Sequence, residues 1–345
     1  MSDTGNKKSS HDSAESADGP RLLKSAANEG ADGVPVRKHE APQVEEVYLD
    51  DDAIDADFTH GRVSEVPLTL AKYSKLETLG YRQNLITVIQ NLQTLTNLRE
   101  IDFHDNQITK IEGLETLVHL QVLDLSFNRI GRIENLNSLT CLKKLFLESN
   151  RIEKMENLSH LVNLELLELG CNRIRVIEGL ENLRNITALY LGKNKLSKIA
   201  HLEHHPKLTI LSLQSNRLTK IEGLDTLVNL VELYLSDNGF TKIEGLEHNL
   251  ALQTLDLASN RITKLENVNH LKGLEEFWFN NNGIDKWEDV NHLAELPKLK
   301  TVYLEHNPIQ AETTYRRKLM LALPQVQQID ATLCRVAEVH SVLSA

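Results

Sequence analysis

From residue 75 onward, leucine and isoleucine recur in a pattern with a 22-residue period. Each unit follows the frame LxxLxLxxNxIxxIxxLxxL, in which most of the x positions are polar. The L-x-L pair alternates with its neighbours, which indicates a short strand with one buried face. The later Ile and Leu positions predict a return path over the same core. A 22-residue unit leaves little room there, so we expect 3₁₀ turns more than full helices.

An asparagine marks the same position in each unit. The series is Asn84, Asn106, Asn128, Asn150, Asn172, Asn194, Asn216, Asn238, Asn260, Asn282 and, after a longer interval, Asn307. A buried amide is tolerated only when it is hydrogen-bonded. Stacked asparagines are therefore expected to bond backbone groups within and between units, as a continuous ladder.

The frame and its period resemble the leucine-rich repeat, whose units span about 20–29 residues. This resemblance implies an α/β solenoid: a horseshoe with a parallel concave sheet and convex 3₁₀ or short helical turns. We expect strands spaced by about 4.8 Å. Because an exposed repeat face needs a cap, both ends are expected to depart from the frame.

The predicted organisation has four parts. Residues 1–57 hold 14 Asp/Glu and 6 Lys/Arg and few large apolar residues, so we expect a disordered acidic tail. Residues 58–306 form about 11 repeats, of which the first is degenerate, with Gly61 at the asparagine position. Residues 307–334 are a C-terminal cap, because Tyr315, Leu319, Met320 and Leu323 recur at helical spacing before Pro324. Residues 335–345 are a loose tail.

The asparagine register predicts which side chains face the concave side of the sheet. Phe277 and Phe279 take the two L-x-L positions of their unit, so Trp278 between them points outward. The same position, four residues before each asparagine, holds Gly80, Asp102, Asp124, Phe146, Glu168, Tyr190, Ser212, Tyr234, Asp256, Trp278 and Tyr303. We call this series the concave row. It contains five aromatic residues, four acids and no Lys or Arg.

We interpret the concave row as a protein-binding surface. Aromatic residues suit strands and can stack on their counterparts in the next repeat, but that does not explain the missing cations. Exposed aromatics beside acids are typical of interfaces, and Trp and Tyr of binding hot spots. Positions beside the row add Glu100, Glu232, Glu276, Glu148 and Glu305, with His104 and Lys144 as cationic exceptions.

Composition and motifs reduce the number of functional classes that fit this sequence. The net charge of −11 disfavours a nucleic-acid partner, and no signal peptide or membrane-spanning run is found. The three cysteines suit neither disulfides nor zinc and favour a reducing compartment.

Cys171 is expected to be a small packing residue. The run from His201 to His205 could hold a metal only on a helix, so we expect it to be a solvent-exposed loop. No catalytic constellation is found, so we expect no enzyme activity.

The repeats, their number and the cap sequence beginning at Tyr315 resemble the leucine-rich-repeat regulatory subunits of protein phosphatase 1. The resemblance covers about residues 58–333 and extends to segments around Leu145, Leu167 and Ser215. It implies a non-catalytic protein, without cofactor or metal of its own, that binds the phosphatase catalytic subunit and controls its maturation, stability, targeting or activity. It also implies a nuclear protein with a cytoplasmic pool, a role in mitotic exit, a monomeric state before binding and a second phosphatase inhibitor as a third partner.

By the same resemblance, the phosphatase-binding positions are Asp124, Phe146, Glu168, Tyr190, Asp256, Glu276, Trp278 and Tyr303. At position 190 the family more often has Phe, and the tyrosine keeps the ring. Secondary candidates are Asp102, Glu148 and Tyr234. Ser9, Ser13 and Ser16 lie near acids and could be phosphorylated, although a solvated tail also explains them. The alternative function is a scaffold for another basic nuclear protein, associated with histones or splicing.

Overall fold

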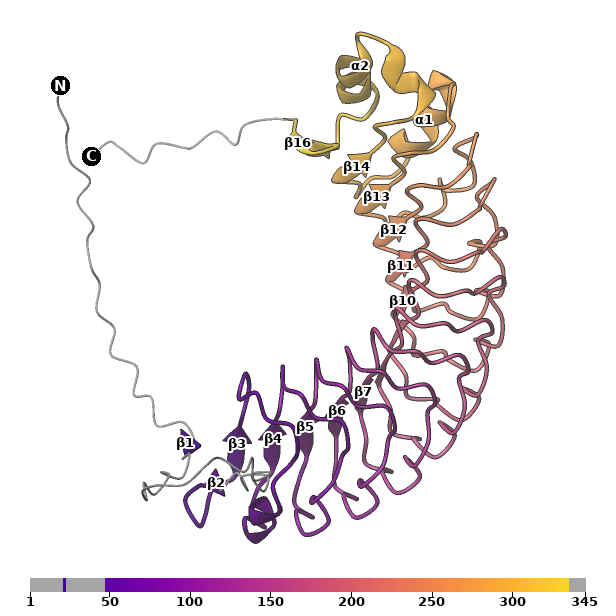
Figure 1. Cartoon of the computed structure of the whole chain (residues 1–345). Helices are drawn as coiled ribbons and strands as arrows, with labels where there is room; N and C mark the ends of the chain where they lie inside the picture. Colours follow the sequence, from indigo (N-terminus) through magenta and orange to yellow (C-terminus); the bar gives the residue numbers. More distant parts are fainter. Residues whose placement is uncertain (1–20, 23–46, 335–345) are drawn as a thin grey trace, which may run out of the picture.

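The computed structural model describes residues 21–22 and 47–334 of the chain. These residues form one curved solenoid, in which parallel strands line the inside of a horseshoe and turns form the outside (Figure 1). Fourteen strands make one sheet in chain order, from β3 at one end to β16 at the other. All neighbours in it pair in parallel except β15 and β16, which form an antiparallel hairpin. The predicted leucine-rich-repeat solenoid is confirmed.

Each repeat contributes a strand of three residues. These strands are β4 Thr78–Gly80, β5 Glu100–Asp102, β6 Val122–Asp124, β7 Lys144–Phe146, β8 Leu166–Glu168, β9 Ala188–Tyr190, β10 Ile210–Ser212, β11 Glu232–Tyr234, β12 Thr254–Asp256, β13 Glu276–Trp278 and β14 Thr301–Tyr303. The middle residue of each strand is fully buried, as is the residue just after each strand. This alternation places the two L-x-L side chains in the core and the residue between them on the concave side.

The asparagine ladder is present. In one repeat, Asn150 Oδ1 accepts the N–H of Ile130 at 2.9 Å. Its Nδ2 donates to the carbonyls of Leu125 at 2.9 Å and Leu147 at 3.1 Å. One amide thus joins two repeats, and the same bonds recur along the array. Each amide of the ladder has partners for its oxygen and its nitrogen, so it stabilises the stack rather than opposing it.

The return path is built mainly from isolated turns with i→i+3 hydrogen bonds. Leu117 N–H bonds the carbonyl of Leu114 at 3.0 Å, and Leu120 N–H that of Leu117 at 3.1 Å. One repeat differs from this prediction, because it contains the α-helix α1, Trp287–Ala294. It is the repeat between Asn282 and Asn307, where the interval is longer than elsewhere in the series. The longer return path has room for a helix.

The N-terminal boundary at residue 58 is wrong. Strand β3, Asp55–Asp57, lies inside the predicted tail and pairs in parallel with β4. Ala56 and Phe58 are buried and occupy the two core positions of the degenerate repeat marked by Gly61. The repeat therefore needs residues ahead of 58. The predicted disorder of residues 1–20 and 23–46, and of 335–345, falls outside the described residues.

Two further segments precede the array. Strand β1, Arg21–Leu22, pairs antiparallel with β2, Val47–Tyr48. Tyr73 holds the segment that follows, because its hydroxyl donates to the carbonyl of buried Val47 and accepts the N–H of Leu49. Tyr73 follows the 3₁₀ helix η1, Leu68–Lys72, which covers this end of the core.

The C-terminal cap contains the predicted helix. After the 3₁₀ helix η2, Pro308–Ala311, helix α2 covers Tyr315–Ala322 and ends before Pro324. Tyr315, Leu319 and Leu323 face the core, whereas Met320 is exposed. The cap ends in β15, Gln328–Ile329, and β16, Thr332–Leu333. The Arg316 guanidinium donates to three carbonyls of this hairpin and fixes it to α2.

Candidate partner-binding face

The structure brings the concave row together as predicted. Its members are the last residues of strands β4 to β14, and neighbouring members are register partners across every strand pair from Gly80–Asp102 to Trp278–Tyr303. The same pairing places Phe146 beside Glu168 and Glu168 beside Tyr190. Glu276 belongs to the adjacent row, between Thr254 and Thr301. The strands that carry the row line the inside of the horseshoe (Figure 1), so the row runs along the inner surface without a break.

The acids of the concave row also have a local structural role that the sequence did not reveal. Each accepts the backbone N–H two residues further on. Asp124 Oδ1 accepts from Ser126 at 2.8 Å, and Glu168 Oε1 accepts from Gly170 at 2.7 Å. Asp102 and Asp256 make the same bond. These bonds satisfy backbone donors at the strand ends, and they hold one carboxylate oxygen of each acid in a fixed position.

The first part of the row is neutralised within the chain. Arg82 Nε lies 2.9 Å from Asp102 Oδ2, and its Nη2 lies 3.6 Å from Asp124 Oδ2. His104 Nδ1 lies 3.7 Å from the same Asp124 oxygen. Sequence reasoning named His104 as a cationic exception but missed Arg82. The signal was available, because Arg82 lies two residues before Asn84, in the same position as His104.

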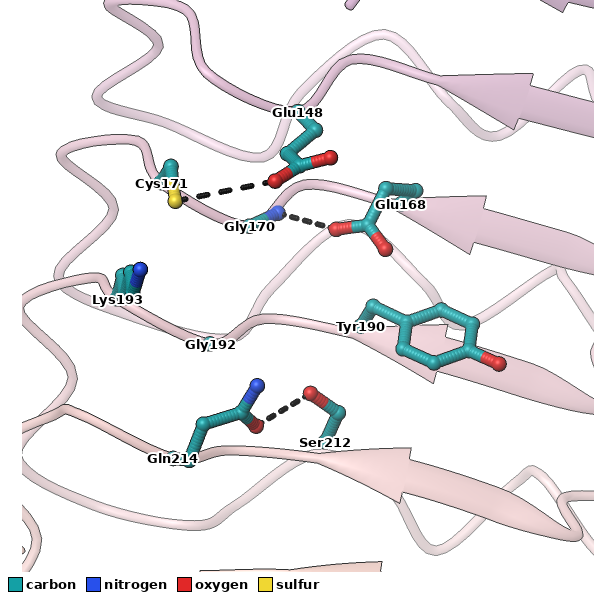
Figure 2. A pocket seen from close by; sticks show the side chains of 9 residues that line it. All are labelled: Glu148, Glu168, Gly170, Cys171, Tyr190, Gly192, Lys193, Ser212 and Gln214. Atoms are coloured by element: carbon teal, nitrogen blue, oxygen red, sulfur yellow. Dashed lines mark hydrogen bonds between the residues drawn. The ribbon is translucent and has the colours of Figure 1, made fainter. Parts of the chain in front are cut away.

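The middle of the face has a hollow. It is lined by Glu148, Glu168, Gly170, Cys171, Tyr190, Gly192, Lys193, Ser212 and Gln214. In Figure 2, Glu148 and Glu168 lie side by side at one end of the hollow. The residues predicted at positions 148, 168 and 190 are thus brought together.

Glu168 is the most strongly perturbed acid of this hollow. Burial raises its pKa to about 7, the N–H of Gly170 opposes that shift, and the neighbouring Glu148 carboxylate adds to it. A carboxyl in this state exchanges its proton near neutral pH and gains from a cation placed beside it. Cys171 lies on the rim of the hollow with its Sγ 4.0 Å from Glu148 Oε1. It has a left-handed φ of 55° and is partly exposed, so it is not the packing residue that was expected.

The end of the row carries the aromatic cluster. The rings of Tyr234 and Trp278 have centroids 6.4 Å apart, across the strand that carries Asp256. Trp278 also meets Tyr303 at 6.1 Å. The outward direction of Trp278 is confirmed, with Phe277 and Phe279 fully buried on the opposite face. The tryptophan is half-buried, however, because its neighbours cover part of the ring.

Two members of the row are less accessible than expected. Ser212 and Asp256 are buried. Burial raises the pKa of Asp256, opposed by hydrogen bonds from Ser236 and the N–H of Ala258. Asp256 lies between Tyr234 and Trp278 in the row and is 5% exposed, so it does not present a free carboxylate.

The prediction for the histidine run is wrong at His205. His201 and His204 are exposed, but His205 is 1% exposed. It takes a position that is leucine in most repeats, and its ring nitrogens lie 3.0 Å from the carbonyl of Leu180 and 3.2 Å from that of Leu202. A backbone carbonyl lies within hydrogen-bonding distance of each ring nitrogen, so whichever nitrogen carries the proton has an acceptor, which explains how a polar residue replaces leucine. Over residues 21–22 and 47–334, no group of three or more His, Cys, Asp or Glu is arranged to hold a metal.

The described part of the chain also contains no helix of the length and apolarity needed to cross a bilayer. Its three cysteines, Cys141, Cys171 and Cys334, are free thiols.

Sequence families support the repeat interpretation. A family described as "Leucine-rich repeat" matches residues 68–171 and 231–341, which is more than half of the chain. A second, described as "Leucine Rich repeats (2 copies)", matches residues 206–248.

Curated relatives are similar over a short stretch. "Protein phosphatase 1 regulatory subunit 7" of Xenopus tropicalis is 63% identical over 43 residues, 12% of each chain. The human protein of the same name is 68% identical over 37 residues, 11% of this chain and 10% of its own length. "Protein phosphatase 1 regulatory subunit SDS22 homolog" of Caenorhabditis elegans is 58% identical over 43 residues, 12% of this chain and 13% of that protein. The matched stretch thus spans about a tenth of the length of these relatives. All three names are of regulatory subunits rather than enzymes, in agreement with the expected lack of enzyme activity.

Solved structures match over most of the chain. An internalin from Listeria monocytogenes superposes with a TM-score of 0.67 at 23% identity, covering 84% of this chain and 90% of that one. A leucine-rich repeat protein from Leptospira interrogans gives 0.65 at 23% identity, covering 80% and 75%. At this identity the likeness concerns the fold alone.

Proposed function

This chain belongs to the leucine-rich repeat family, and from that premise we propose that it is a non-catalytic regulatory subunit of protein phosphatase 1. In this proposal the concave row binds the catalytic subunit and controls its maturation, stability, targeting or activity. The names of the relatives support the choice of partner.

The observation that carries the proposal is the unbroken concave row. From Asp124 to Tyr303 it places acids, aromatic rings and one serine on the inner surface of nine consecutive strands, in register and without one Lys or Arg. Nine strands at about 4.8 Å span roughly 40 Å. That length suits an interface of about 800 Å² on each partner.

The two halves of the face favour different contacts. The hollow beside Glu148 and Glu168 suits a lysine or arginine of the partner, because a cation there would offset the unfavourable burial of the carboxyl. The cluster of Tyr234, Trp278 and Tyr303 suits an apolar surface, and such rings are typical hot spots. The acids near Arg82 are already paired and are expected to contribute less.

The wider setting belongs to the same proposal. From the family resemblance we expect a nuclear location with a cytoplasmic pool, a role in mitotic exit and a monomeric state before binding. We also propose a second phosphatase inhibitor as third partner and phosphorylation at Ser9, Ser13 and Ser16.

Calorimetry with the full chain and purified phosphatase catalytic subunit tests the proposal. We expect the wild type to bind and Trp278→Ala to lose about 2 kcal/mol of binding free energy, with circular dichroism unchanged. Val162→Ala is the matched control, because Val162 is exposed on the return path away from the concave row. A folded wild type that does not bind the phosphatase would contradict the proposal and point to another basic nuclear partner.

A further inference from the structure

A row of cations lies at the rim of the solenoid, directly after the asparagine ladder. Arg129, Arg151, Arg173, Lys195 and Arg217 each follow the asparagine of their repeat. Their backbones are in register, because each N–H bonds a carbonyl of the preceding repeat at 2.8 Å, as from Arg151 to Ile130. Five like charges are thus stacked on neighbouring repeats, about 5 Å apart.

A second row of cations runs beside the first. Arg132, Lys154, Lys198 and Lys220 lie three residues further along in four of the same five repeats, and all four are exposed. In the remaining repeat, exposed Arg175 takes the adjacent position. We call these two rows, with Arg175, the basic rim. Glu153 is the one acid between the first and second rows in these repeats.

The basic rim is poorly neutralised by the chain itself. The ion pairs within the described residues are Arg132 with Glu156 at 2.8 Å, Lys220 with Glu222 at 3.6 Å and Arg173 with Glu153 at 3.8 Å. The other members of the rim have no ion pair in that part of the chain. In the next repeat Lys242 makes the same pair as Lys220, with Glu244 at 2.9 Å. Beside Lys198 the corresponding acid is absent, since Ala200 stands at that position.

The first row of the basic rim is concentrated in the middle of the array, whereas the second-row position also holds a lysine in four repeats outside it. Before it, the position after the asparagine holds Leu85 and Gln107, and after it Gly239 and Gly283, with Arg261 between them. Like charges on adjacent strands are destabilising, so the fold does not require this row. The fold thus presents, across five repeats, a line of charge that costs stability.

We propose that the basic rim binds an acidic polypeptide segment of a partner protein. Five repeats at about 5 Å cover roughly 20 Å, the length of an extended segment of about six residues. Each arginine or lysine of the basic rim can pair with one carboxylate of such a segment, and an arginine can do so with two hydrogen bonds. A nucleic acid fits less well, because the two rows contain no aromatic residue for base stacking and the chain carries a net charge of −11.

The rim and the concave row are separate surfaces. The row lies on the strands, whereas the rim lies on the loops that the strands lead into. Figure 2 shows this direction: β9 carries Tyr190 on the strand, and Lys193 lies beyond its end, two residues before Lys195. A partner in the concave face and an acidic segment on the rim can therefore be bound together.

Fluorescence anisotropy with a labelled ten-residue glutamate peptide tests the rim on the full chain. We expect binding that weakens between about 50 and 200 mM salt. The triple variant Arg151→Gln, Arg173→Gln, Lys195→Gln should lower the affinity for the peptide about tenfold. The control triple Lys242→Gln, Lys264→Gln, Lys286→Gln removes the same charge from later repeats and should change this affinity less than twofold.

Three results would overturn the inference. One is a wild type that does not hold the peptide even at the low-salt end of this range, and another is an equal loss in both triples. The third is tighter binding of a ten-residue oligothymidine through the same three cations, which would assign the rim to nucleic acid. Trp278→Ala should leave peptide affinity unchanged, so this test is independent of the phosphatase proposal. Circular dichroism of each triple establishes that it is folded.

Discussion

The rings of Trp278 and Tyr303 meet edge to face, with centroids 6.1 Å apart and planes inclined by 70°. Tyr303 is itself held by Gln328, whose Nε2 donates to the tyrosine hydroxyl at 2.9 Å. The C-terminal cap therefore fixes Tyr303, and Tyr303 fixes one side of the tryptophan. The geometry of the aromatic cluster depends on the cap that closes the array.

The first prediction is an energetic coupling between these two rings. A double-mutant cycle of Trp278→Ala and Tyr303→Ala, followed by urea unfolding, should give a coupling of about 1 kcal/mol, as expected for an edge-to-face aromatic pair. Tyr303→Phe keeps the ring and loses only the hydroxyl, so a cycle of Trp278→Ala with Tyr303→Phe should give a coupling near zero. Purely additive effects of the two alanine substitutions would show that the rings do not support each other.

The second prediction concerns Glu168 and pH. Its pKa is raised from an ordinary value of 4.5 to about 7, mainly by burial. The folded protein therefore holds this proton more tightly than the unfolded chain, and the free energy of unfolding falls as pH rises from 4.5 to 7. Glu168→Gln removes this loss, so the variant should gain on the order of 2 kcal/mol relative to wild type at pH 8 and little at pH 5.

Urea unfolding at pH 5, 6, 7 and 8 measures this difference. Val162→Ala is the control, because Val162 is exposed on the return path and has no titratable group, so its difference from wild type should not vary with pH. A Glu168→Gln variant whose stability relative to wild type is constant over this range would refute the raised pKa. If the phosphatase places a cation beside Glu168, binding releases this proton, and affinity should increase from pH 6 to pH 8.

The third prediction concerns the asparagine ladder. Asn150→Ala leaves the N–H of Ile130 without its partner, whereas the carbonyl of Leu125 loses one donor and keeps the amide of Asn128. A buried group without a partner costs about 1–3 kcal/mol, so the variant should lose on the order of 2 kcal/mol in chemical unfolding. Arg151→Ala, at the next residue, removes an exposed side chain and should change stability by less than about 0.5 kcal/mol. Comparable losses in both variants would contradict the special role of the amide.

Much of this architecture could be predicted because every repeat must satisfy the same physical constraints, so the same residue pattern recurs along the sequence. The repeat period and the strand alternation are sufficient to place Trp278 outward and Phe277 inward. Register follows from the repeat itself, since equivalent positions of successive repeats occupy the same place on neighbouring strands. The concave row is a direct consequence of that periodicity.

The features that the sequence did not predict have a different origin. They depend on contacts with backbone groups, which the pattern of side chains does not reveal. His205 is polar, which predicts exposure, yet backbone carbonyls beside its two ring nitrogens offer its N–H an acceptor inside the core. Residues just before each asparagine adopt positive φ whatever their type, as Phe127 and Cys171 do. The strand-end bonds of Asp124 and Glu168 are likewise made to backbone N–H groups.

The last prediction uses a second left-handed position, seven residues after each ladder asparagine from Asn84 to Asn260. Gly179 has φ 73° there, and Asn157 has φ 59° in the preceding repeat. A Cβ added to Gly179 would lie 2.7 Å from the carbonyl oxygen of Met155. Asn157 occupies the same position because its Nδ2 donates to the carbonyl of Ile133 at 2.7 Å. Left-handed backbone costs a non-glycine residue about 1–2 kcal/mol, and a side chain that bonds the opposing carbonyl offsets part of that cost.

Gly179→Ala should therefore be destabilised by about 1–2 kcal/mol in urea unfolding. Gly179→Asn should recover about 1 kcal/mol of that loss, through a new bond from its amide to Met155. The reciprocal pair at residue 157 supplies the control: Asn157→Gly should be nearly neutral, whereas Asn157→Ala loses the bond and keeps the strain. If alanine and asparagine were equally destabilising at residue 179, the amide bond would not explain why asparagine and glycine share this position along the array.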